Sequence, residues 1–521
     1  MKEEIKNYYY EIKSGFVNYK NYFLFALFCG ILTHFLFLSN YLINHDSVLS
    51  YYSDSSWLLT QGKWFAGPVS LIKGSLAIKF LQAVIGIVVT AITGCLIIDI
   101  LKIKNKIAGY LSLGLLAVFP SAAVCMMYNG FDYFSITAFL AVASAYFGKN
   151  KSVLSFFLAV AFLTLSLGTY QGYIGFAGCI FVTICIKQIS DKNIKFSQIL
   201  WNGFYYVSIL ITSVIAYYII LQIVIKTSGI DLSSYKGINN MTGILKPSVF
   251  FEAIKVAYTS VLGFFWNFNL GPTSAGSILI NRSFLILLII SFVIMLAKLV
   301  LNKQFSKIIL GIILFVVFLP LSANIIGILS NNSSYYWVTA YYLSMLIICG
   351  ISIIFDYDKS DKFLLSDSKR AVAFISFFVC CSMIFNYFIL VNRQYEKARY
   401  ASIQLESKIT MLAGDIYKTE GFKRDTPVMF VGEGPFEFLN PVGISSAFGQ
   451  YSIIGFDNAD NITANKDLLI NYINNVPGYN FTYKSDDESL EKYSEEISEM
   501  QVYPYGESIK IIDNVCFVKL S

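Results

Sequence analysis

Eleven long apolar stretches run through the first 391 residues of this chain, and they restrict its possible folds more than any other feature. Each has close to the 20 or so residues that an α-helix needs to cross the hydrocarbon core of a bilayer. They cover residues 22–42, 77–101, 107–125, 132–148, 152–168, 170–187, 203–226, 280–300, 308–329, 336–355 and 371–391. We therefore predict a mainly α, polytopic membrane protein with a GT-C-like arrangement of helices. The first stretch lacks a small-residue cleavage site, so we expect it to remain as an anchor.

The distribution of charge divides the chain into two parts. Only 14% of the 521 residues are charged, against roughly 25% in soluble domains. Residues 1–391 carry a net charge of +13 and residues 392–521 a net charge of −7. The basic residues are scattered over short loops, which excludes a nucleic-acid-binding face, and the nine cysteines show no metal-site spacing. We predict a membrane domain over residues 1–391, a polar domain over residues 392–521, and no metal or cofactor.

Lysine and arginine predict the sidedness of the membrane domain, because they accumulate in cytoplasmic loops. One set of alternate connections holds 19 of them and the opposite set eight, spread over longer segments. The richer set comprises Lys2, Lys6, Lys13, Lys20, Lys102, Lys104, Lys106, Lys149, Lys151, Lys187, Lys192, Lys195, Lys298, Lys303, Lys307, Lys359, Lys362, Lys369 and Arg370. We expect a protein of the cell membrane with a cytoplasmic N-terminus and with residues 392–521 outside.

The polar segments also have predictable structure. The outer loop 43–76 suits short surface helices around residues 48–59 and 64–72. The outer loop 227–279 contains an aromatic stretch, 256–268, which could lie in the interface or dip back into the protein. The tail reads as a small α/β domain, with helices at 396–420, 465–474 and 489–500 and strands at 427–431, 502–505 and 509–519, the last broken at Asp513-Asn514.

Acidic residues on the outer side of the membrane domain are the candidates for chemistry, because charge within a bilayer must line a cavity or a rim. Asp46 follows the first span, beside His45, and suits a carboxylate that meets a lipid head group; a helix cap or a solvated loop acid is the alternative. Asp54 suits an N-cap for the next short helix. Asp132 lies at the start of the fourth span, where a negative charge interacts favourably with the helix dipole. Asp231 and Glu252 are interpreted as ordinary loop acids.

Other polar residues should gather at the same outer rim. Tyr170 and Gln171 lie in the outer turn between the fifth and sixth spans, so we expect them near Asp132 and Asp46. Outer cations could hold a lipid phosphate, although snorkelling explains each of them equally well. They are Lys63, Lys73, Lys79 and Arg282. His34, halfway along the first span, is interpreted as a satisfied core histidine.

Several short motifs, taken in order, resemble the bacterial serotype-converting glucosyltransferase family (GtrII-like). They are Asp46 after the first span, Gln61-Gly62-Lys63-Trp64, Phe119-Pro120-Ser121, Tyr128-x-x-Phe131-Asp132, Ser166-Leu-Gly-Thr-Tyr-Gln171 and the C-terminal segment from Val502 to Leu520. Members resemble the GT-C class of integral membrane glycosyltransferases. They typically carry paired acids after the first span and a Gly-Arg pair, where this chain has His45-Asp46 and Gly62-Lys63. The lysine replaces a planar phosphate clamp with a point charge.

The resemblance implies the transfer of a hexose, usually glucose, from a polyprenyl-phosphate donor to a cell-surface polysaccharide such as an O-antigen or a teichoic acid. It implies Asp46 as the general base on the acceptor hydroxyl, with His45 and Asp132 as further catalytic candidates and no metal. Outer cations would steady the leaving phosphate. The expected substrate-binding residues are Asp54, Lys63, Trp64, Tyr170, Gln171 and Arg282, with the aromatic rings stacking on sugars and the tail helping to bind the acceptor.

Three other readings remain open. A flippase for a lipid-linked sugar predicts polar residues near the bilayer midplane and often an internal repeat, whereas the polar residues here gather at one rim. A polysaccharide polymerase or ligase usually relies on arginines in a large outer loop, and residues 227–279 contain none. A non-catalytic scaffold should tolerate replacement of Asp46 by Asn.

Overall fold

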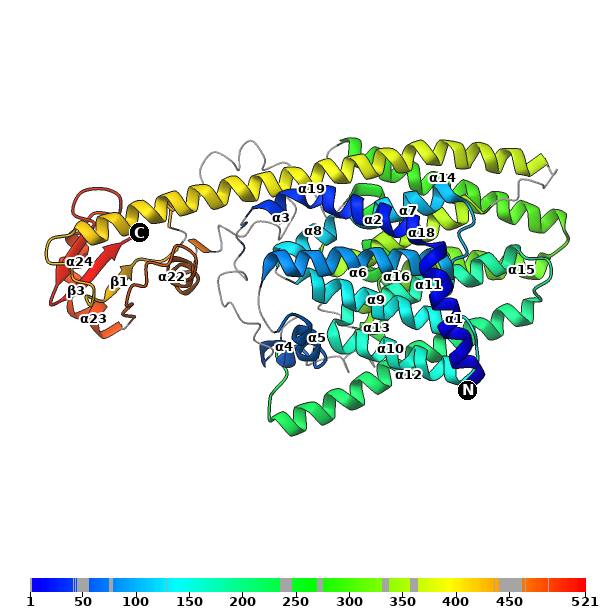
Figure 1. The fold of residues 1–521 in the computed structure, drawn as a ribbon, viewed down its shortest axis with the longest axis horizontal. Helices are drawn as coiled ribbons and strands as arrows, with labels where there is room; N and C mark the ends of the chain where they lie inside the picture. Colours follow the sequence, from blue (N-terminus) through cyan, green and yellow to red (C-terminus); the bar gives the residue numbers. More distant parts are fainter. Residues whose placement is uncertain are drawn as a thin grey trace. The chain divides into compact units, whose positions relative to one another are not determined.

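The protein forms two compact units, each with its own buried core. This computed structural model describes residues 2–40, 42, 44, 56–74, 78–128, 130–234, 246–268, 275–329, 337–356, 364–434, 436–439, 462–463, 465–485 and 487–521. The first unit comprises residues 1–35, 53–126 and 130–391, and the second comprises residues 36–52, 127–129 and 392–521. The first is a bundle of helices and the second contains the sheet (Figure 1).

Apolar helices make up the first unit, as the eleven stretches predict. In chain order the helical elements up to the second unit are α1 (Lys2–Asn18), α2 (Lys20–Thr33), α3 (Phe35–Ser39), α4 (Ser56–Thr60), α5 (Ala66–Ser70), η2 (Leu71–Lys73), α6 (Lys79–Ile100), α7 (Lys106–Val118), α8 (Pro120–Met127), α9 (Phe131–Gly148), α10 (Val153–Thr169), η3 (Gln171–Tyr173), α11 (Ile174–Ser190), α12 (Phe196–Ser228), α13 (Pro247–Asn267), α14 (Ala275–Leu301), α15 (Phe305–Ile312), η5 (Ile313–Phe318), α16 (Leu319–Ala323), α17 (Ile325–Leu329), η6 (Thr339–Tyr341), α18 (Tyr342–Ile354) and α19 (Leu364–Lys418). Within the described residues, nine helices are long and apolar enough to cross a membrane, and three further apolar helices are shorter. The mainly α, polytopic membrane fold is thus confirmed.

One long apolar helix was not among the predicted spans. The aromatic stretch predicted at 256–268 is part of α13, a continuous helix of 21 residues that begins with Pro247 at its first turn. Proline suits that position because its missing N–H has no helical partner there. The helix packs against α14, α16 and α17, and its Phe264 and Phe265 are buried. The stretch therefore belongs to the bundle rather than to an irregular loop.

The centre of the bundle is formed by helices that are apolar on every side. All 13 residues of α18 are buried, and α9 packs between α6 and α10. By contrast, α12 and α14 expose many large apolar side chains, such as Phe204 and Ile215 on α12 and Val293 on α14. Helices that are apolar all round are buried or face lipid, so α18 forms the core and α12 and α14 face the hydrocarbon.

Three of the predicted spans are interrupted. The first breaks at His34, between α2 and α3. The third breaks at Phe119, whose extended backbone is the conformation that a residue before proline prefers. The ninth contains a six-residue π-helix, η5, between α15 and α16. The apolar runs therefore locate these crossings but not the points at which their helices break.

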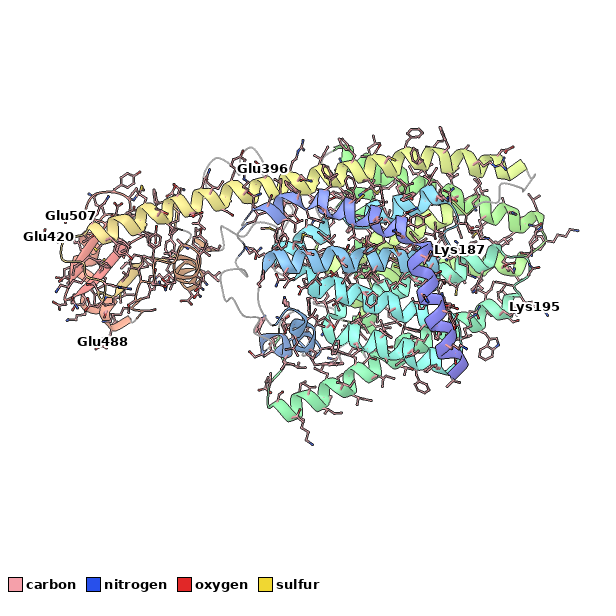
Figure 2. The ribbon with its side chains drawn as sticks, viewed as in Figure 1. Lys187, Lys195, Glu396, Glu420, Glu488 and Glu507 are labelled. Atoms are coloured by element: carbon pink, nitrogen blue, oxygen red, sulfur yellow. The ribbon has the colours of Figure 1, made fainter. Side chains whose placement is uncertain are left out.

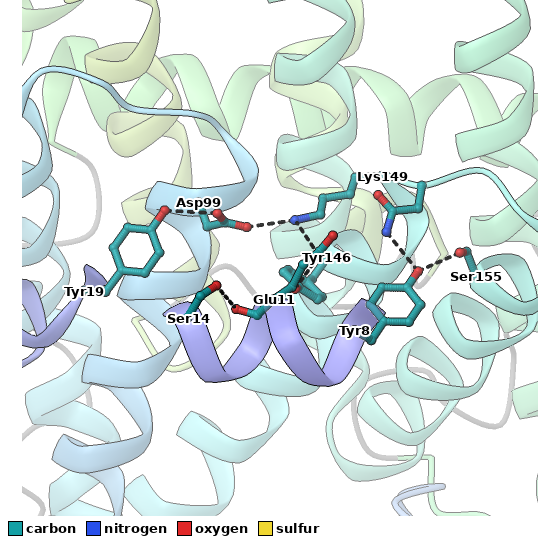
Figure 3. Close-up of polar contacts among 9 residues, drawn as sticks. Tyr8, Glu11, Ser14, Tyr19, Asp99, Tyr146, Lys149 and Ser155 are labelled. Carbon is teal, nitrogen blue, oxygen red and sulfur yellow. Dashed lines mark hydrogen bonds and ion pairs between the residues drawn. The ribbon is translucent and has the colours of Figure 1, made fainter. Parts of the chain in front are cut away.

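The end of the bundle at which α9 finishes is fixed by a polar network (Figure 3). Lys149 Nζ lies 2.8 Å from Asp99 Oδ2, and the Tyr19 hydroxyl donates to Asp99 Oδ1 at 3.0 Å. The Tyr146 hydroxyl donates to Glu11 of α1 at 3.0 Å. We call this the Lys149 end, and the opposite end, at which α9 begins, the Asp132 end. The network attaches α1 to the helices of the bundle.

The second unit is a small α/β domain built on three strands. β1 (Val428–Val431) pairs parallel with β3 (Val515–Lys519), which pairs antiparallel with β2 (Ile509–Ile512), giving the order β1-β3-β2. Asp513 and Asn514 join β2 to β3 with φ of 45° and 62°, as a tight hairpin turn requires. The end of α19 and the helix α22 (Lys466–Asn475) contribute to the core, and α23 (Asp487–Lys492) and α24 (Ser494–Glu499) follow.

The predicted elements of this domain agree with the structure except at one strand. The helix predicted at 396–420 is the continuation of α19, and the strands predicted at 427–431 and 509–519 are present. Residues 502–505, predicted as a strand, form turns instead, although the Tyr503 amide donates to the Lys519 carbonyl at 2.8 Å. Figure 2 labels Lys187 and Lys195, near the connection from α11 to α12, and Glu420, Glu488 and Glu507, on the second unit.

Candidate functional site

A tight turn at the Asp132 end presents the motif Gln61-Gly62-Lys63-Trp64. The amides of Gly62 and Lys63 bond back to the carbonyls of Leu59 and Leu58, at 2.9 and 3.0 Å, and so end α4. Gly62 has a φ of +71°, and a Cβ there would lie 2.7 Å from the Tyr217 hydroxyl. The turn therefore needs glycine for both its left-handed backbone and its close approach to α12.

The same turn is docked on the end of α10. The Phe65 amide donates to the carbonyl of Gly168 at 2.7 Å. The indole of Trp64 lies directly over Gly168, where a Cβ would come within 2.5 Å of the ring. The Tyr133 hydroxyl of α9 donates to the neighbouring Thr169 carbonyl. Backbone and ring contacts thus hold the turn, α9 and α10 together.

Gln171 is the centre of a buried hydrogen-bond network. Its Nε2 donates to the Gln61 carbonyl at 3.1 Å and to the Tyr217 hydroxyl at 2.8 Å. The Tyr217 hydroxyl in turn donates to the Gly62 carbonyl at 3.0 Å. Buried polar groups need such partners because an unmet one costs about 1–3 kcal/mol. The network therefore fixes the turn that carries Lys63.

Two neutral side chains are among the contacts of Lys63. Its Nζ donates to the Gln61 Oε1 at 2.5 Å and lies 5.1 Å from the centre of the Tyr170 ring. An ammonium over an aromatic face is attracted by the ring quadrupole. Lys63, Tyr170, Gln171 and Trp64, four of the predicted substrate-binding residues, are thereby brought together.

A buried ion pair joins the loop segment to the start of α9. Lys73 Nζ lies 2.9 Å from Asp132 Oδ2, and the side chains are 5% and 3% exposed. Lys73 ends the short helix η2, and Gly74 follows with a φ of +65°. Among the residues that the structure describes, the other carboxylate oxygen, Oδ1, is buried without a hydrogen-bond partner, as is Trp64 Nε1. The Asp132 end therefore contains both a buried acceptor and a buried donor whose hydrogen bonds are unmade.

Of the remaining predicted site residues, the structure describes only Arg282. His45, Asp46 and Asp54 lie outside the described residues, so their roles stay predictions. Arg282 of α14 contacts α13 instead: its Nε donates to the Trp266 carbonyl at 2.6 Å, and its guanidinium lies 4.7 Å from the centre of the Trp266 ring. Among the residues that the structure describes, no cluster of three His, Cys, Asp or Glu could hold a metal ion.

His34 occupies a separate place, inside the bundle. It is 1% exposed, and its Nε2 lies 3.2 Å from the Ala117 carbonyl. Beside it is a cavity of about 10 Å³, lined mainly by apolar groups of α2, α6 and α7 and by Phe131, which has room for about one water molecule. Buried, hydrogen-bonded and beside a cavity too small for a sugar, His34 has the environment of a core residue.

Comparison with known proteins identifies the membrane unit. The family model described as glucosyl transferase GtrII matches residues 35–348, more than half of the chain. This chain belongs to the GtrII family. Neither a curated protein nor a solved structure matches it.

Membership of the GtrII family makes the chain a glycosyltransferase, with a sugar donor and an acceptor as its substrates. The matched residues include Lys63, Asp132 and Gln171 and end within α18. The family assignment therefore covers all of the described polar group at the Asp132 end. It does not extend to the sheet of the second unit.

Sequence reasoning missed two parts of the site in this GtrII-family chain. Tyr217 lies within the predicted span 203–226, and nothing in an apolar run distinguishes one tyrosine whose hydroxyl meets a polar turn. Gln61 was noticed as part of a motif but not as a partner of Lys63. The signal available for both was the motif itself, because a buried glycine turn needs polar partners for its backbone.

Proposed function

We propose that this protein transfers glucose from a polyprenyl-phosphate-linked donor to a cell-surface polysaccharide on the outer face of the cell membrane. The observation that carries the proposal is the gathering of Lys63, Trp64, Tyr170 and Gln171 at one end of a bundle of the GtrII family. Cations and aromatic rings at a membrane rim suit a sugar joined to a lipid phosphate.

The proposed sidedness follows from the lysine distribution. Lys102, Lys104, Lys106 and Lys149 lie at the Lys149 end of the bundle or in the connections there, which favours that end as cytoplasmic. The Asp132 end is then outer. The lysine-rich connection before α19 favours an outer location for residues 392–521 too, whichever way α13 lies.

In the proposed mechanism the acceptor hydroxyl attacks the anomeric carbon of the donor, and the bond from that carbon to the lipid phosphate breaks. Asp46 takes the proton of the hydroxyl as general base, and Lys63 steadies the phosphate as it leaves. The phosphate departs without needing a proton, so one carboxylate suffices and no metal is required. Trp64 and Tyr170 would stack on the sugar, and Gln171 holds the turn in place.

A direct test is the transfer of radiolabelled glucose from a synthetic polyprenyl-phosphate glucose by the purified full-length protein in detergent. Asp46→Asn should lower the rate by at least about 100-fold, as expected for loss of a general base. Asp231→Asn, in a described loop after α12, is the matched control and should transfer at the wild-type rate. Equal rates for the two variants would refute the role of Asp46.

The principal alternative, a flippase for a lipid-linked sugar, is separated by the same assay. A flippase moves its cargo between leaflets and forms no glycosidic bond, so it cannot label an acceptor in detergent. The wild-type protein should give a labelled polysaccharide, and digestion with a glucosidase should release the label as free glucose. Failure to label any acceptor, together with donor movement in vesicles, would favour the flippase.

A further inference from the structure

The geometry points to Asp132 as the residue that accepts a hydrogen bond from a hydroxyl group of the transferred sugar, with Lys73 as the positioning residue that holds its carboxylate. This inference rests on the proposed function and adds to it a specific contact with the donor. It also gives Asp132 a role in binding the sugar instead of a role in proton transfer.

The Lys73–Asp132 pair is buried more deeply than the stability of the fold requires. Both side chains are at most 5% exposed at a separation of 2.9 Å. Taking two charges out of water costs several kcal/mol each, and apolar residues of similar volume often give equal or better stability. A buried pair at the end of a membrane bundle is therefore poorly explained by stability alone.

The Asp132 carboxylate has only one of its two oxygens engaged by the described residues. Lys73 engages Oδ2, while Oδ1 is buried and has no hydrogen-bond partner in the described part of the chain. Asp99, in the pair at the Lys149 end, has both oxygens engaged, by Tyr19 and by Lys149 (Figure 3). Buried polar atoms are nearly always hydrogen-bonded, so an exception needs an explanation. A ligand that donates a hydrogen bond supplies one.

The ligand that suits this carboxylate is a hydroxyl group and not a phosphate. A phosphate would be repelled by the carboxylate, whereas a hydroxyl donates to it in a strong, charge-assisted bond. A hydroxyl can also accept from a donor such as Trp64 Nε1, the unpartnered indole nitrogen at the same end. A sugar carries several such hydroxyls. Asp132 lies in the first turn of α9. A sugar would therefore reach it from the Asp132 end of the bundle, by displacing side chains there.

Lys73 has a defined part in this contact. Its ammonium fixes Oδ2 and thereby orients Oδ1 as a hydrogen-bond acceptor. Lys73→Arg should preserve the contact and Lys73→Met should remove it.

The test uses purified full-length enzyme and polyprenyl-phosphate glucose together with its 2-, 3-, 4- and 6-deoxy analogues. For each protein, kcat/KM with each analogue is divided by kcat/KM with glucose. The ratio does not depend on the fraction of enzyme that is folded. In the wild type, the analogue that lacks the hydroxyl bound by Asp132 should react roughly 10- to 150-fold more slowly, as loss of a hydrogen bond to a charged group predicts.

Asp132→Asn, and the neutral pair Lys73→Met with Asp132→Asn, should reduce this penalty at least about fivefold for that analogue alone. Asp99→Asn, which breaks the pair at the other end of α9, is the matched control and should leave every ratio unchanged. Retention of the wild-type ratios by both Asp132 variants would overturn the inference, as would equal wild-type rates with all four analogues. If the wild type transfers no glucose at all, the proposed function fails, and this inference fails with it.

Discussion

The two ends of α9 carry lysine–aspartate pairs of nearly the same length in different surroundings. At the Lys149 end the side chains of Lys149 and Asp99 are 24% and 32% exposed, and at the Asp132 end those of Lys73 and Asp132 are 5% and 3% exposed. Both oxygens of Asp99 have donors, whereas one oxygen of Asp132 has no hydrogen-bond partner within the described ranges. The distance between the charges therefore says little about a pair. Burial and the number of satisfied oxygens distinguish the structural end from the end that needs a ligand.

The largest expected difference comes from removing the lysine of each pair. Lys73→Met leaves the Asp132 carboxylate buried and unpaired, which should lower the free energy of unfolding by about 3–5 kcal/mol. Lys149→Met breaks a partly exposed pair and should cost less than about 1 kcal/mol. Thermal unfolding in one detergent measures both. Similar losses of stability would show that burial does not separate the two pairs.

The next largest effect concerns the glycine turns at the Asp132 end. Gly62→Ala should cost about 1–2 kcal/mol for its left-handed backbone and more for the clash with the Tyr217 hydroxyl. Gly74 has a similar φ but open space around it, so Gly74→Ala should show the backbone cost alone. Unfolding of the two variants under identical conditions gives the contribution of the clash by difference. A smaller loss for Gly62→Ala than for Gly74→Ala would contradict the packing described here.

Removal of one hydroxyl tests the network behind Lys63. Tyr217→Phe deletes the bond to the Gly62 carbonyl and one of the two bonds of Gln171, and should cost about 1–2 kcal/mol. Because the turn carries Lys63, KM for the lipid-linked donor should rise more than kcat falls. Tyr218→Phe is the neighbouring control, since Tyr218 is 44% exposed, and it should leave both constants unchanged. An unchanged KM in Tyr217→Phe would show that the network does not affect binding of the donor.

The smallest effect is expected at the Lys149 end. Tyr19→Phe removes one of the two donors of Asp99 at a partly exposed site, which should cost about 0.5 kcal/mol. Transfer activity should stay at the wild-type level, because this end is proposed to lie in the cytoplasm. Chemical denaturation followed by tryptophan fluorescence measures the first quantity, and the glucose-transfer assay the second. Loss of activity without loss of stability would show that the Lys149 end takes part in function, and would contradict the assignment of the site to the Asp132 end.

Most of the fold was predictable from the sequence because the bilayer allows few structures. Each apolar run of sufficient length must form a helix whose backbone is satisfied internally, and eleven such runs were found. α13 was missed because Glu252 and Lys255 interrupt its apolar character and its aromatic residues also suit an interfacial segment. In the second unit, residues 502–505 contain the valine and tyrosines typical of a strand, but they make a turn and a bend instead, and the described sheet is formed by β1, β2 and β3.

The sequence predicted the site only through one rule, that a residue at the end of an apolar run lies at the rim of the membrane domain. Asp132, Tyr170 and Gln171 follow from this rule, since each lies at the end of an apolar run, whereas Lys63 was predicted from its motif in the outer loop 43–76. The pairing of Lys73 with Asp132 does not follow, because many lysines and acids share a rim and only packing decides which of them meet. Arg282 obeyed the rule but was placed against Trp266 by the helix that sequence reasoning had missed.

The contact between Trp64 and Gly168 means that a missing side chain sets where the sugar-facing turn can lie. The indole rests on the backbone of α10 with no room for a methyl group, so each added carbon at residue 168 would push the ring outward together with the neighbouring lysine. Among relatives of this enzyme, the size of that one residue would then tune how wide an opening is offered to a branched or bulky glycan, without any change to the groups that perform the reaction.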